Sequence, residues 1–180
     1  MARDMTKGRI LPQMTTFAIP LILGNLFQIL YNATDSIIVG KFVGDDALAA
    51  VGTAGPIMNM AILFISGMCM GAGILMSTLY GAKDMKNLEK QISTTLIGGL
   101  VFSLLIAFLM IVFAVPILRL INSPEEIIGS AAIYLRVVFL GLIFTFVYNF
   151  LANTLRALGD SRTPLYFLVI SAFLNVAGDL

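Results

Sequence analysis

Hydrophobic residues run along this 180-residue chain in long stretches that short polar connectors separate. A helix needs about 20 predominantly apolar residues to cross a bilayer. Four segments meet this requirement, 11–40, 47–80, 92–118 and 127–155. A fifth, 164–180, is still apolar at the last residue. Because the fifth segment is still apolar at the last residue, we expect an N-terminal piece of a longer protein. The pattern predicts an all-α integral membrane protein with five spans.

Composition narrows the class of protein further. Hydrophobic residues make up 59% of the chain and charged residues only 12%, with a mean hydropathy of +0.98. A soluble domain carries about 25% charged residues. The single cysteine and the absence of histidine exclude a disulfide framework and leave no zinc site. Basic residues are scattered at the ends of apolar segments, so we expect the lipid bilayer as a partner and no nucleic acid.

The distribution of Lys and Arg predicts the orientation. Eight lie on the side of the N-terminus and of the second and fourth connectors, against two on the other side. Short cytoplasmic loops of membrane proteins carry an excess of these residues. We therefore expect a multi-pass protein of the inner (plasma) membrane with a cytoplasmic N-terminus.

Polar residues in the first segment share one helical face. Asn25, Gln28, Asn32 and Asp35 recur at steps of three, four and three residues. Such a face turns toward a helix bundle or a water-filled cavity, because lipid cannot satisfy polar groups. For the three amides, hydrogen bonding between helices is an equally open interpretation. A carboxylate costs far more to keep in a membrane, which makes Asp35 a candidate functional residue.

A second acid lies in the fifth segment, where Asn175 and Asp179 are one helical turn apart. Asp179 lies about 22 Å above the predicted cytoplasmic start of its span, and Asp35 is near the outer end of the first. Both acids therefore fall in the outer half of the membrane. Two carboxylates and an amide oxygen suit a small cation such as Na⁺, or a pair that shares one proton. Chance placement near the chain end is the open alternative.

Four other residues inside the spans are candidates for structural or functional roles. Tyr134 has a predicted depth close to that of Asp179, whereas Asn149 lies in a polar stripe nearer the cytoplasm that packing explains equally well. Arg136 is expected to extend toward the outer interface. Pro20 removes a backbone hydrogen bond from the first helix and is a candidate site of bending.

Four stretches, in this order and spacing, resemble the N-terminal part of multidrug and toxic compound extrusion (MATE) transporters of the bacterial NorM and DinF branch. They are IPLILGNLFQILYNATDSIIVGKFVGDDALAAVG, STLYGAKDMKNLEKQ, NTLRALGDSRTP and NVAGD. The resemblance implies a twelve-helix protein with two six-helix lobes, of which this chain supplies five spans of the first. The missing C-terminal part would be its partner.

The resemblance also implies a function. It implies a transporter rather than an enzyme, which exports cationic or amphipathic compounds in exchange for Na⁺ or H⁺ and needs no cofactor. By the same resemblance Asp35, Asn175, Asp179 and Tyr134 form the cation or proton site, with Na⁺ as a possible ligand of the first three. Pro20 would bend the first helix, and Asn25, Gln28, Asn32 and Asn149 would line the cavity.

Two other functions stay open. A lipid-linked precursor flippase of the same superfamily would need basic residues along its cavity for phosphate. Arg136 is the only basic residue deep in a span, which favours cationic cargo. A membrane-embedded lipid-modifying enzyme would need acids clustered at a cytoplasmic helix end to bind Mg²⁺, and the acids inside spans lie toward the outer side.

Overall fold

The computed structural model describes residues 9–42 and 45–179. Within these ranges the side chains of a few residues are outside the description, namely 31–32, 35–36, 39–40, 42, 45–48, 175–177 and 179. The described chain is helical apart from short connectors, with helices α1 (Ile10–Phe42), α2 (Asp45–Gly81), α3 (Met85–Leu120), α4 (Glu125–Leu140), α5 (Leu142–Ala157) and α6 (Arg162–Asp179). The predicted all-α fold is confirmed.

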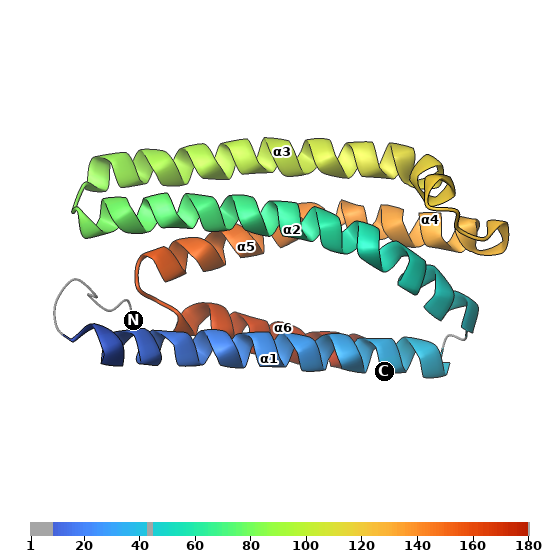
Figure 1. The fold of residues 1–180 in the computed structure, drawn as a ribbon, viewed down its shortest axis with the longest axis horizontal. Coiled ribbons are helices and arrows are strands. Elements are labelled where there is room, and N and C mark those ends of the chain that lie inside the picture. Colours follow the sequence, from blue (N-terminus) through green and yellow to red (C-terminus); the bar gives the residue numbers. More distant parts are fainter. Residues whose placement is uncertain (1–8, 43–44, 180) are drawn as a thin grey trace.

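The helices form two groups that lie side by side (Figure 1). Helices α2, α3, α4 and α5 pack into a bundle, and α1 packs along α6 next to it. The two groups approach each other where α1 meets α2 and where α5 meets α6. Helices α1 and α6 run in the same direction, from the end that holds the α5–α6 connector to the opposite end.

The bundle core lies between α2, α3, α4 and α5. Its largest fully buried side chains include Phe139, Phe146 and Ile65, and the ring of Phe146 stacks on that of Phe150. Gly99 of α3 lies directly against the Phe146 ring, so that a β-carbon at this position would overlap it. Because glycine has no side chain, α3 and α5 can approach closely at Gly99, as helices do at small residues in membrane bundles.

The fourth predicted span, 127–155, is two helices in the structure. Helices α4 and α5 meet at Gly141 with a bend of 42°. The Gly141 N–H donates to the carbonyls of both Val137 (3.3 Å) and Val138 (3.0 Å), which tightens the last turn of α4. Apolar periodicity runs unbroken through this point, which is why the sequence alone indicated one continuous span.

Helix lengths define which elements can cross a membrane. Among the described residues α1, α2 and α3 are long and apolar enough, and the bent α4–α5 pair meets the same criterion if it is taken as one span. Helix α3 begins at Met85, seven residues before the predicted apolar start, because Asp84 caps it by accepting hydrogen bonds from the Asn87 N–H (3.2 Å) and side-chain amide (2.6 Å). Helix α6 is shorter, with an apolar part of Arg162–Leu174.

Candidate functional site

The first candidate site depends on how α1 packs on α6. Pro20 and Gly24 of α1 are both buried and lie one turn apart on the same face. A β-carbon on Gly24 would meet Leu168 at 3.6 Å and Leu165 at 3.7 Å. Helix α1 continues through Pro20 without a break, although proline cannot donate the hydrogen bond to the carbonyl four residues earlier. This face is therefore the α6-facing side of α1.

The register of this contact fixes which segments of the two helices share a level. Both helices rise by about 1.5 Å per residue in the same direction. Eleven residues beyond Gly24 lies Asp35, and eleven residues beyond Leu165 and Leu168 lies the segment 176–179. The backbone level of Asp35 thus matches the end of α6, where Asn175 and Asp179 are found. The side chains of Asp35, Asn175 and Asp179 are outside the described part.

Tyr134 is the other residue predicted for the cation site, and Asn25, Gln28, Asn32 and Asn149 are the residues predicted to line the cavity. Asn25 and Gln28 are exposed, and the side chain of Asn32 is outside the described part. Tyr134 is half-buried and packs against the bundle core, and within the described residues its helix α4 makes no close backbone contact with α1 or α6. Asn149 donates its side-chain amide to the Thr145 carbonyl (2.9 Å) of its own helix.

Metal binding was part of the prediction for Asp35, Asn175 and Asp179. Within the described part of the chain no group of three or more His, Cys, Asp or Glu side chains could hold a metal ion. The chemistry of the three predicted ligands, two carboxylates and one amide oxygen, fits Na⁺, which prefers hard oxygen donors as other hard cations do. Na⁺ binding at these residues stays a prediction.

A second candidate site lies at the opposite end of the lobe, where α5 ends and α6 begins. Helix α5 stops at a Schellman motif: Gly159 adopts φ 86°, its N–H donates to the Arg156 carbonyl (3.0 Å), and the Asp160 N–H donates to the Leu155 carbonyl (2.9 Å). Asp160 then caps α6. Its carboxylate accepts from the N–H groups of Arg162 and Thr163 (both 3.1 Å) and from the Thr163 hydroxyl (2.7 Å).

Side chains of α5 pack against α2 and hold the last turns of α5 in place. Gly73 of α2 lies against Asn153, whose β-carbon and carbonyl oxygen would both be 3.6 Å from an added β-carbon. The Thr154 hydroxyl reaches the sulfur of Met76 (3.6 Å) as well as the Phe150 carbonyl (2.8 Å). The backbone around Arg156 is therefore fixed by packing on one side and by the Schellman motif on the other.

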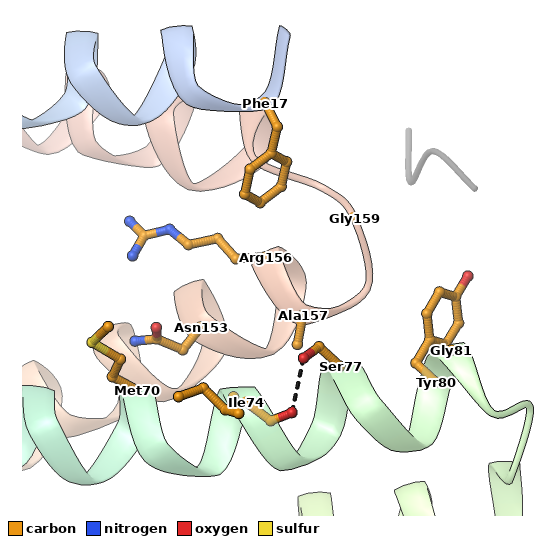
Figure 2. Close-up of a pocket in the computed structure, with 11 residues that line it drawn as sticks. Phe17, Met70, Ile74, Ser77, Tyr80, Gly81, Asn153, Arg156, Ala157 and Gly159 are labelled. Atoms are coloured by element: carbon orange, nitrogen blue, oxygen red, sulfur yellow. Dashed lines mark hydrogen bonds between the residues drawn. The ribbon is translucent and has the colours of Figure 1, made fainter. Parts of the chain in front are cut away.

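An open cavity of about 480 Å³ lies between α1, α2 and the end of α5 (Figure 2). This volume is within the range of small-molecule sites. Its walls combine apolar and polar side chains, among them Phe17, Met70, Ile74, Ser77, Asn153 and Arg156. The Ser77 hydroxyl donates to the Ile74 carbonyl (2.8 Å), and the Asn153 amide donates to the Asn149 carbonyl (2.8 Å). No Asp or Glu is among the described residues that line this cavity.

Arg156 was not predicted from the sequence as a functional residue, although it lines this cavity. In Figure 2 its guanidinium extends away from the α5–α6 connector and into the space between α1 and α2. Its Nε is buried and has no hydrogen-bond partner among the described residues. The one sequence signal was its place in the stripe of small and polar residues in α5, seven residues after Asn149 and four after Ala152.

Comparison with known proteins gives the family. The MatE family model matches residues 20–180. Two Bacillus subtilis (strain 168) proteins are similar to this chain over almost its whole length. "Probable multidrug resistance protein YpnP" is 35% identical over 97% of this chain and 39% of its own length, and "Probable multidrug resistance protein YoeA" is 34% identical over 96% and 37%. The chain thus spans less than two fifths of these relatives.

Solved structures agree with the sequence comparison. A MATE structure in the straight conformation matches with a TM-score of 0.90, and one in the bent conformation with 0.88, both at 26% identity. Each match covers 98% of this chain and 39% of the solved chain. The transporter resemblance predicted from the sequence is confirmed, and the chain belongs to the MatE family, a family of multi-pass membrane transporters rather than enzymes.

Proposed function

We propose that this chain forms the N-terminal lobe of a secondary transporter that exports cationic or amphipathic compounds in exchange for Na⁺ or H⁺. The observation that carries the proposal is the parallel packing of α1 on α6, with a register that matches the backbone level of Asp35 to the segment 176–179. The names of the two Bacillus relatives, both of which begin "Probable multidrug resistance protein", support the substrate class.

The coupling step follows from the cost of a buried charge. An ionised carboxylate inside a membrane is costly, and protonation or cation binding removes most of that cost. When the coupling ion binds at Asp35 and Asp179, α1 can pack more tightly against its neighbours and bend at Pro20, where one backbone hydrogen bond is already absent. The existence of straight and bent conformations among solved MATE structures supports a cycle between two shapes.

The orientation belongs to the same proposal. The N-terminus is cytoplasmic and the protein lies in the inner (plasma) membrane, as the Lys and Arg distribution predicts. The acids then lie toward the outer side, where an outward-open cavity exchanges drug for the coupling ion.

The first experiment replaces Asp35 in the protein expressed from its complete reading frame. Asp35→Asn keeps the shape of the side chain but cannot titrate, so efflux of a cationic dye from everted vesicles should fall to a small residual rate at normal expression. Glu126→Gln, which removes an exposed acid at the start of α4, should leave efflux unchanged. Full drug resistance in the Asp35→Asn strain would contradict the proposal.

A double-mutant cycle tests whether the two acids act together. Groups that act as a unit give strongly non-additive losses. The double variant Asp35→Asn, Asp179→Asn should therefore transport no worse than the weaker single variant. Losses that multiply would assign the acids to separate steps. Repeating the assay with an imposed Na⁺ gradient and, separately, a pH gradient identifies the coupling ion.

The flippase alternative has less support. Arg136 is exposed and donates its Nε–H to the Ile111 carbonyl of α3 (3.3 Å), so it is held on the outer surface of the bundle. Arg156 is the one basic side chain among the described residues that line the cavity. A single guanidinium does not neutralise the charge of a lipid-linked diphosphate cargo.

A further inference from the structure

We propose that the cavity between α1, α2 and the end of α5 is a binding site for an amphipathic anion, with Arg156 holding an anionic phosphate head. The site lies at the opposite end of the lobe from Asp35 and is independent of the proposed coupling mechanism.

The direction of the Arg156 side chain is the first observation. An arginine at the end of a membrane helix ordinarily extends toward the aqueous interface to keep its charge hydrated. Arg156 lies in the last turn of α5, yet its guanidinium extends away from the α5–α6 connector and into the lobe (Figure 2). Packing of Asn153 on Gly73 and the Schellman motif at Gly159 hold the backbone from which this side chain extends.

The charge of the site is the second observation. The Arg156 Nε is buried without a hydrogen-bond partner in the described part of the chain. The neighbouring acid, Asp160, is engaged in capping α6. Arg156 is half-buried, and an anionic ligand would supply the hydrogen-bond acceptor that its buried Nε lacks among the described residues. The planar guanidinium matches phosphate in particular, because two parallel N–H groups can bind two of its oxygens.

The third observation is the apolar wall opposite the charge. Phe17 of α1 and Met70 and Ile74 of α2 line the same cavity, and Ile74 is 59% exposed. A free phosphate ion would leave these side chains uncovered, whereas an acyl chain or other apolar body covers them. The predicted cytoplasmic location of this end favours such a ligand, since anionic lipids of the inner leaflet concentrate there.

Binding of lysophosphatidylglycerol to the purified full-length protein in neutral detergent tests the proposal. This probe has one apolar chain and a net negative phosphate head. Lysophosphatidylcholine carries the same chain with a neutral headgroup, and inorganic phosphate carries the charge without a chain. We expect lysophosphatidylglycerol to bind about ten times more tightly than lysophosphatidylcholine, because one charge-assisted contact is worth about a factor of ten. It should also bind more tightly than inorganic phosphate, which leaves the apolar wall uncovered.

Three variants assign the binding to this cavity. Arg156→Gln should weaken lysophosphatidylglycerol binding about tenfold. Ile74→Trp should weaken it by filling the apolar part, and it keeps the test valid if Arg156→Gln does not fold. Arg162→Gln removes an exposed charge six residues away and should change the affinity less than about twofold.

Several results would overturn the proposal. Unchanged affinity in Arg156→Gln or in Ile74→Trp would place the probe elsewhere. An equal loss in Arg162→Gln would indicate general surface attraction. Equal binding of lysophosphatidylcholine would remove the role of the anionic charge, and equal binding of inorganic phosphate would remove the role of the apolar wall.

Discussion

Asp160 uses both carboxylate oxygens to connect α5 to α6. Oδ1 accepts from two backbone N–H groups of the first turn of α6, and Oδ2 accepts from the Thr163 hydroxyl. Removing a helix cap of this type costs about 0.5–2 kcal/mol. We expect Asp160→Ala to lower the thermal melting midpoint in detergent, whereas Asp160→Asn, which keeps one capping oxygen, lowers it less. Equal midpoints for wild type and Asp160→Ala would contradict this role.

The pH dependence of Asp160 follows from the same contacts. Burial raises the pKa of its carboxyl, but hydrogen bonds from Thr163 and Arg162 outweigh burial and hold the pKa below its usual 3.8. Because the folded pKa is the lower one, the stabilisation is fully present above pH 3.8 and is lost as the pH falls through the folded value. The melting difference between wild type and Asp160→Asn should therefore shrink in this acidic range. A difference that stays constant from pH 7 to pH 3 would refute the assignment.

Gly99 offers a steric prediction with a neighbouring control. A β-carbon at Gly99 would overlap the Phe146 ring, so Gly99→Ala should destabilise the bundle by about 1–3 kcal/mol, the usual cost of overpacking. Gly98→Ala adds the same methyl group to open space and should be neutral or slightly stabilising. Melting midpoints of the two purified variants provide the comparison, and identical behaviour would exclude close packing of α3 on α5.

At the scale of elements, the pairing of α1 with α6 depends on a small residue. The β-carbon of Gly24→Ala would make ordinary contacts with Leu165 and Leu168, so this variant should keep its stability and transport. The larger side chain of Gly24→Leu would push α1 away from α6 and shift Asp35 relative to Asp179. We expect lower efflux and a lower melting midpoint for Gly24→Leu alone. Normal efflux in that variant would show that this contact does not set the register.

At the scale of the whole molecule, the distribution of Lys and Arg predicts which side of the membrane each connector lies on. Reporter domains fused after Arg9 and after Lys83 should be cytoplasmic, and one fused after Asp45 should be on the outer side. Fusions that report both ends of α2 on one side of the membrane would show that α2 does not cross it. If all three reporters lay on the opposite sides, the cytoplasmic location of the N-terminus would be refuted.

The sequence by itself determined the all-helical membrane fold, the MatE resemblance and the approximate helix positions. These depend on local properties: the length of apolar runs, capping residues and connector composition. The depth of Asp35 and Asp179 in the membrane stays a prediction, which rests on the constant rise of residues along a helix. The bend at Gly141 was not, since the apolar pattern on both sides of it continues without a break.

Only the tertiary structure decided which helices meet and where side chains extend. The pairing of α1 with α6, and not with the bundle along its whole length, follows from the contact of Gly24 with Leu165 and Leu168, residues far apart in the chain. The sequence placed Arg156 at a membrane interface, where most arginines extend toward water. In the structure it extends inward, from a backbone held by the packing of α5 on Gly73 and by the Schellman motif that follows. Contacts between distant segments such as α2 and α5 cannot be derived from one helix alone.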